Sequence, residues 1–167
     1  MLDAAPLIAL ASAEALDLLP RLGLRLTVVS EVRAEVLGPE RHPGAERLRT
    51  FLEEGPIEVV RTRSPAVLRR LRGNPRLSAA DAASLCAAIE TGATLIADDR
   101  DLRSAAKLAG VNVGGSLFLL ALAVRQGLLR PREAVGVAER MIASGWYCSP
   151  TLLKAFAEAV GRDRERG

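Results

Sequence analysis

Short apolar runs of the kind that form buried strands alternate with longer amphipathic stretches along the whole chain. The runs at residues 24–29, 57–60, 94–97 and 111–113 are strand-like, and residues 1–3 are typical of the end of a further, very short strand. Helices are predicted between and after them, at residues 6–19, 30–37, 44–54, 64–72, 78–90, 99–108, 116–126, 132–144 and 151–160. Such alternation favours a parallel sheet covered by helices on both faces. We therefore expect an α/β fold, namely a three-layer α/β/α domain with a mostly parallel central sheet.

The length of 167 residues is that of one domain. Residues 128–161 are expected to form a C-terminal helical extension, and residues 162–167 a frayed tail. The only histidine, His42, excludes a two-His metal site within one chain. Two cysteines, Cys86 and Cys148, exclude a Cys-rich zinc site and fit a reduced compartment. No stretch reads as a signal peptide or a membrane span, so we expect a cytoplasmic protein.

Acidic side chains recur around the ends of the predicted strands, where open parallel sheets bind ligands. One lies in the first turn of the helix that leads into the strand at residues 94–97, and three follow that strand directly. The full set is Asp3, Glu35, Asp81, Asp98, Asp99 and Asp101. Their joint placement predicts that several of them meet at one edge of the sheet.

Each acid also has an ordinary interpretation. Asp3 is equally typical of a turn or a helix entry, and Glu35 of a solvated helix face. Asp81 can form a capping box with Ser78, and Asp99 can cap the helix that it precedes. The two other acids after the strand at residues 94–97 are expected to be exposed.

A cluster of carboxylates with no histidine or thiol suits Mg²⁺ or Mn²⁺, which prefer oxygen ligands. Without a cation, crowded carboxylates repel one another and their pKa values rise. A bound cation removes that repulsion. It can also generate hydroxide and stabilise the displacement at a phosphoryl group.

The acids fall in four segments, residues 2–8 (LDAAPLI), 29–36 (VSEVRAEV), 77–82 (LSAADA) and 94–102 (TLIADDRDL). In order and spacing these segments resemble the motifs of the PIN-domain family. Members of that family are metal-dependent ribonucleases, common as toxins in prokaryotic toxin–antitoxin pairs. The resemblance covers nearly the whole chain. It implies a PIN-like fold, an RNA substrate, a small antitoxin protein as a partner, and a homodimer.

The resemblance also implies roles for individual acids. Asp3, Asp81 and Asp99 would hold Mg²⁺ or Mn²⁺. Glu35 would orient or deprotonate the attacking water, and Asp101 would support the metal site. The chain is thus predicted to be a PIN-type endoribonuclease.

The chain departs from the family pattern at three positions. The family usually carries Ser or Thr shortly after its first Asp and two residues before the Asp of the fourth motif. Here those positions are Ala4, Ala5 and Ala97. The alternative is therefore a PIN-like protein that is catalytically weak or inactive and has a nucleic-acid-binding or regulatory role. A small-molecule enzyme on a doubly wound sheet is disfavoured, because the glycine pair at residues 114–115 lacks the spacing of a phosphate-binding loop.

Residues 61–77 form the most polarised stretch of a chain whose net charge is only +3. The stretch contains no acid and six arginines, Arg61, Arg63, Arg69, Arg70, Arg72 and Arg76. Because it precedes the Asp81 helix, it is predicted to flank the acidic site and to contact an RNA backbone. A solvated helix face and a docking surface for an acidic partner are the alternatives.

Aromatic residues make up only 3% of the chain, which argues against RNA-binding modules that stack bases on aromatic platforms. Trp146 and Tyr147 are adjacent in the sequence. They could stack on a base, but the sequence favours a packing anchor for the C-terminal helix.

Overall fold

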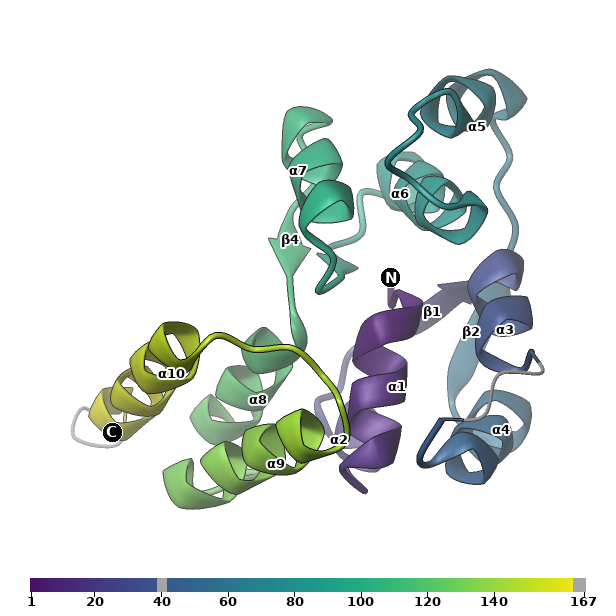
Figure 1. Ribbon diagram of the computed structural model, residues 1–167. Coiled ribbons are helices and arrows are strands. Elements are labelled where there is room, and N and C mark those ends of the chain that lie inside the picture. Colours follow the sequence, from purple (N-terminus) through teal and green to yellow (C-terminus); the bar gives the residue numbers. More distant parts are fainter. Residues whose placement is uncertain (39–41, 164–167) are drawn as a thin grey trace.

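The computed structural model describes residues 1–38 and 42–163. In this part of the chain, helices dominate and short strands lie between them (Figure 1). The strands are β1 (Leu26–Val29), β2 (Ile57–Val60), β3 (Leu95–Ile96) and β4 (Val113–Gly114). The helices are α1 (Ala4–Ser12), α2 (Leu18–Arg21), α3 (Ser30–Val36), α4 (Ala45–Glu54), α5 (Pro65–Arg72), α6 (Ala79–Thr91), α7 (Arg100–Leu108), α8 (Ser116–Arg125), α9 (Pro131–Ala143) and α10 (Pro150–Asp163).

The strands form two parallel pairs, β1 with β2 and β3 with β4. The backbone at the start of the chain lies between the two pairs and joins them. The Leu2 N–H donates to the Thr27 carbonyl of β1 at 2.8 Å, and the Asp3 N–H donates to the Ile96 carbonyl of β3 at 3.0 Å. The predicted parallel pairing is therefore confirmed, whereas the complete three-layer arrangement stays a prediction.

The predicted helix at residues 6–19 is wrong, because the chain breaks into α1 and α2. Glu14 adopts the left-handed conformation with φ of 57°. The Ala15 N–H then donates to the Leu10 carbonyl at 2.8 Å, and the Glu14 N–H donates to the Ala11 carbonyl at 3.2 Å, which is a Schellman ending. The exposed side chain of Glu14 forms an ion pair of 2.6 Å with Arg47 of α4.

Helix α6 packs against both pairs of strands. It contacts β1 and β3 as well as α3, α5 and α7. Every side chain from Ala82 to Ala88 is buried, and small residues allow this close approach on all sides. Cys86 is among them, so its predicted place in the core is confirmed.

The last three helices, α8, α9 and α10, pack against one another, and α9 also contacts α1. Figure 1 shows them gathered at the lower left, away from α5. α10 continues to Asp163, and the remaining residues of the predicted frayed tail, 164–167, lie outside the described residues. No helix within residues 1–38 and 42–163 is long and apolar enough to cross a bilayer.

Candidate functional site

Among the residues that the structure describes, Asp3 is the buried acid. Its side chain is 4% exposed and lies at the junction between the end of the short first strand segment and α1. Burial raises the pKa of this carboxyl to about 7, and the negative charges of Asp81, Glu35 and Asp98 add to the rise. A backbone hydrogen bond from Ala4 acts in the opposite direction. Acids from α3, α6 and the end of β3 therefore raise the pKa of one buried carboxyl, which is the effect expected of crowded carboxylates.

Asp81 lies in the first turn of α6 and is half-buried. Its Oδ2 accepts the Ser78 N–H at 2.7 Å, while the Ser78 hydroxyl accepts the Asp81 N–H at 3.0 Å. The capping box is confirmed. It also fixes the position of the Asp81 carboxylate, whose negative charge raises the pKa of Asp3. Asp81 therefore belongs both to the cap of α6 and to the group of acids around Asp3. Glu35, the acid on α3, is exposed.

Asp99 is the N-cap of α7 and is exposed. Its Oδ1 accepts the Leu102 N–H at 2.8 Å, which confirms the capping interpretation. Asp101, one turn into the same helix, is half-buried and forms an ion pair of 3.5 Å with Arg76. This pair brings the arginine-rich segment to the start of α7.

Asp98 differs from the sequence prediction, which placed it on the exposed surface. It is half-buried, and its Oδ1 accepts the Ser116 N–H at 2.8 Å. Its Oδ2 accepts the Ser116 hydroxyl at 2.5 Å and the indole N–H of Trp146 at 2.9 Å. Asp98 thus caps α8 from another segment of the chain. The available sequence signal was Gly115, where a Cβ would lie 2.8 Å from the Asp98 carboxylate.

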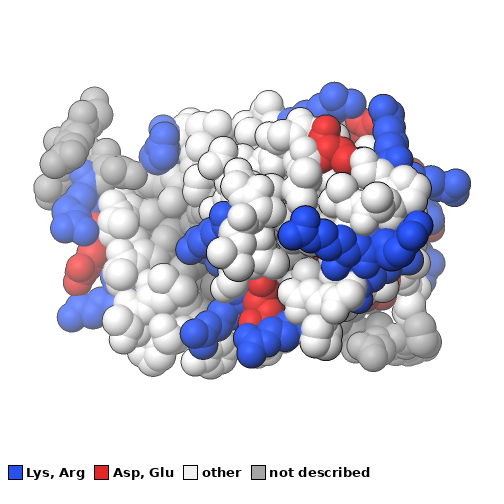
Figure 2. All heavy atoms as spheres, turned by 90° about the horizontal axis from the view of Figure 1, so that it is seen from above, with Lys and Arg blue, Asp and Glu red and all other residues white. Residues whose placement is uncertain are grey.

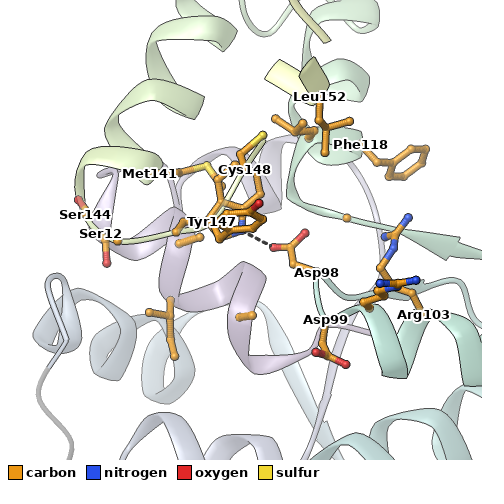
Figure 3. A pocket seen from close by; sticks show the side chains of 18 of the residues that line it. Ser12, Asp98, Asp99, Arg103, Phe118, Met141, Ser144, Tyr147, Cys148 and Leu152 are labelled. Carbon is orange, nitrogen blue, oxygen red and sulfur yellow. Dashed lines mark hydrogen bonds between the residues drawn. The ribbon is translucent and has the colours of Figure 1, made fainter. Parts of the chain in front are cut away.

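A cavity of about 930 Å³ opens beside these acids. Asp98 and Asp99 form part of its wall, and their carboxylates point in different directions (Figure 3). Arg103 of α7 also lines it, with its Nη1 donating to the Ala97 and Gly114 carbonyls, each at 2.8 Å. This guanidinium is therefore held at the ends of β3 and β4.

Trp146 and Tyr147 line the same cavity from the segment before α10. Trp146 is half-buried, packs against the core and bonds to Asp98, so the predicted packing anchor is confirmed for this residue. Tyr147 is 86% exposed. His42 lies on the cavity wall, and its ring nitrogens contact the carbonyls of Pro43 and Val36.

All six arginines of residues 61–77 are exposed. Arg72 pairs with Glu31 of α3 at 3.5 Å, and Arg76 pairs with Asp101. Within the described part of the chain, the other four form no side-chain ion pair: Arg61, Arg63, Arg69 and Arg70. Figure 2 shows Lys and Arg side chains gathered at the right of the upper face, the side on which α5 lies in Figure 1.

The acids supply only hard oxygen donors. The pKa of Asp3 is raised mainly by burial and further by the negative charges of nearby acids, which a divalent cation would neutralise. The donor chemistry therefore fits Mg²⁺ or Mn²⁺. Across residues 1–38 and 42–163, however, no three His, Cys, Asp or Glu side chains are grouped closely enough to hold an ion. Side-chain rearrangement would be needed to complete a coordination shell.

A comparison with models of protein families finds a match. The model of a family described as a PIN domain matches residues 1–162, nearly the whole chain. The comparison with curated proteins finds no match.

Proposed function

This chain belongs to the PIN-domain family, and on that premise we propose that it is an endoribonuclease that depends on Mg²⁺ or Mn²⁺. PIN domains are generally nucleases, and those nucleases usually use divalent metals. The observation that carries the proposal is the buried Asp3, whose pKa rises to about 7 through burial and the charges of neighbouring acids. Three further acids lie near enough for their charges to act on it, namely Asp81, Glu35 and Asp98.

We assign the metal to Asp3, Asp81 and Asp99. Two of these carboxylates are already held in place by local hydrogen bonds, Asp81 through Ser78 and Asp99 through the Leu102 N–H. Each of these capping hydrogen bonds engages one carboxylate oxygen and so fixes the direction of the other. These hydrogen bonds limit the freedom of two ligands, although the three carboxylates must still move together to complete a coordination shell.

When bound, the cation supplies Lewis acidity and lowers the pKa of water. Glu35, whose charge acts on Asp3, is assigned to orient or deprotonate that water. Asp101 supports the site, and its charge is balanced by Arg76 at 3.5 Å. The arginines around α5 hold the phosphate backbone, because four of them are exposed and their guanidinium groups form no ion pair within residues 1–38 and 42–163.

A second candidate function is that of a PIN-like protein with little catalytic activity, which binds RNA or has a regulatory role. Two observations favour it. Ala4 and Ala97 are buried, so methyl groups occupy positions where the resemblance leads one to expect a hydroxyl. The described residues also lack a ready group of three metal ligands.

The toxin role, a small antitoxin partner and a homodimer complete the proposal and rest on the family resemblance alone. Co-expression with the product of an adjacent small gene, followed by size-exclusion chromatography with light scattering, tests both partners. A monomer that co-purifies with nothing removes this part of the proposal and leaves the nuclease assignment in place.

The deciding experiment is cleavage of labelled single-stranded RNA by the purified protein with Mg²⁺ or Mn²⁺, and with EDTA. We expect cleavage only with metal, and a rate at least about 100-fold lower in Asp99→Asn, as for loss of a major transition-state stabiliser. Asp17→Asn is the matched control, because Asp17 is exposed on α2 and pairs only with Arg21 among the described residues. Equal rates for Asp99→Asn and wild type would remove the site assignment. Metal binding without cleavage of any RNA would favour the second candidate.

A further inference from the structure

The cavity beside Asp98 and Asp99 is lined by an unusual share of the chain's aromatic residues. The sequence has only five, and three of them, Phe118, Trp146 and Tyr147, line this one cavity. They come from α8 and from the segment before α10 (Figure 3). Aromatic side chains that are scarce in a chain but meet at one opening indicate a binding surface.

Two of these rings are offered to solvent, while the third is fixed. Tyr147 is 86% exposed and Phe118 is 44% exposed. Trp146 is held by its indole hydrogen bond to Asp98 and by its backbone N–H, which donates to the Met141 carbonyl at 3.0 Å. The cavity therefore combines a rigid aromatic wall with two rings whose faces are available for stacking.

A fixed cation completes the cavity. Both hydrogen bonds of the Arg103 guanidinium use Nη1, which spans the carbonyls at the ends of β3 and β4. Its Nε and Nη2 donors have no other partner in the described part of the chain. A guanidinium held in this way can donate to a phosphate or to the edge of a base without further ordering.

We propose that this cavity is a nucleobase subsite for single-stranded RNA. A base stacks on Tyr147, and Arg103 holds the adjoining phosphate or base edge. The subsite rests on the proposed function, because Asp99 belongs to both the cavity wall and the assigned metal ligands. It lies next to the place of cleavage and fixes which nucleotide is positioned there.

The size and chemistry of the cavity favour a nucleotide over a protein segment. About 930 Å³ is within the range of roughly 300–1,000 Å³ that holds compact ligands. Stacking of bases on aromatic rings beside arginine is the usual way in which proteins bind unpaired nucleotides. The alternative occupant of the same rings is a docked protein segment, and titration with nucleotides distinguishes the two.

Binding can be followed directly, because Trp146 is the only tryptophan. The probes are nucleoside monophosphates and a 2′-O-methyl oligoribonucleotide, which cannot be cleaved through its 2′ position, titrated in EDTA while the Trp146 emission is recorded. We expect saturable quenching. Tyr147→Leu should weaken binding by about 5-fold to 100-fold, the effect of removing one base–aromatic stack. Tyr147→Phe retains the ring and should bind within about 2-fold of wild type.

The matched control is Leu108→Ala, since Leu108 is 91% exposed on α7 and does not line the cavity. This variant should bind as wild type does. Equal affinity of Tyr147→Leu and wild type overturns the subsite. Absence of quenching by every nucleotide also overturns it and leaves protein docking as the explanation of the exposed rings.

The subsite and the nuclease assignment fail in different ways. If Tyr147→Leu weakens the quenching of Trp146 emission but the protein cleaves no RNA, the result supports the subsite and removes the nuclease activity. Metal-dependent cleavage with the same KM in Tyr147→Leu and wild type retains the nuclease activity and removes the subsite.

Discussion

The carboxylate of Asp98 accepts the indole N–H of Trp146 at 2.9 Å, across 48 residues of sequence. The same carboxylate accepts both the backbone N–H and the hydroxyl of Ser116. One side chain therefore fastens the end of β3 to the start of α8 and to the segment that leads into α10. The neighbouring residue, Asp99, is one of the three assigned to the metal. The fold and the proposed active site are thus coupled through two adjacent residues.

Removal of the Asp98 carboxylate should destabilise the protein. Asp98→Ala leaves the donors of Ser116 and Trp146 without their acceptor, and we expect a loss of about 2–3 kcal/mol in the free energy of unfolding. The Trp146 emission of the native protein should also shift to the red as the indole gains contact with water. Urea unfolding followed by circular dichroism measures the first effect. Asp17→Ala, at an exposed aspartate, should change stability by less than about 0.5 kcal/mol.

The stability of the metal-free protein should fall as the pH rises, through the titration of Asp3. Its pKa is raised from an ordinary 3.8 to about 7 in the folded state, so the folded state holds the proton more tightly than the unfolded chain does. The destabilisation begins above about pH 4 and is complete above about pH 7, where it reaches roughly 4 kcal/mol at most.

Asp3→Asn removes this titration while nearly preserving the shape of the side chain. In EDTA the variant should melt higher than wild type at pH 8, and the two should converge near pH 4. Thermal melts of both proteins across this pH range provide the measurement. A constant difference between the two proteins at all pH values would show that Asp3 does not titrate in this range.

Manganese should stabilise the wild type through the same acids. At a free concentration 100 times the dissociation constant, the gain is about 2.7 kcal/mol. Asp99→Asn should gain much less, because it lacks one assigned ligand. In EDTA it should melt close to wild type, because Asp99 is exposed and an asparagine oxygen can still accept the Leu102 N–H. Melts with and without Mn²⁺ test both expectations, and equal gains in the two proteins would exclude Asp99 as a ligand.

The arginines of α5 should contribute to RNA affinity through counterion release. The double variant Arg69→Ala, Arg70→Ala removes two exposed cations with no acidic partner in residues 1–38 and 42–163. If both contact phosphates, the slope of log K against log salt should become shallower by about 1.4 for single-stranded RNA. The control Arg47→Ala, Arg49→Ala removes two arginines of α4 that are paired with Glu14 and Glu46. A slope that changes equally in both double variants would argue against a specific RNA contact at α5.

Local patterns in the sequence were enough to place elements whose boundaries are set locally. The predicted β2 and the end of α5 at Arg72 agree with the structure. α6 begins after its cap Ser78 and ends at Gly92, which adopts the left-handed conformation that glycine allows. In each case the determinant is a cap or a turn within a few residues.

The failures involve determinants that lie far away in the chain. Nothing in the run from Pro6 to Leu19 predicts a break, because Glu14 is an ordinary helix former. In the fold Glu14 adopts the left-handed conformation of a Schellman ending and pairs with Arg47, 33 residues away. Asp98 was expected at the surface because its partners are Ser116 and Trp146. The same limit applies to the site: strand ends indicated which acids could meet, but ligand distances depend on packing between α1, α3, α6 and α7.

The position of Leu2 between β1 and β3 has a consequence for the order of events during synthesis. Its partner across the parallel bridge is Ile96, and the sheet cannot join its two halves before that residue has left the ribosome. At about 5–20 residues per second, the start of the chain must wait roughly 5–20 seconds for this partner. During that interval the β1–β2 pair has an open edge. Contacts so distant in sequence also slow folding in the free chain, so the joining of the sheet is expected to be a late step.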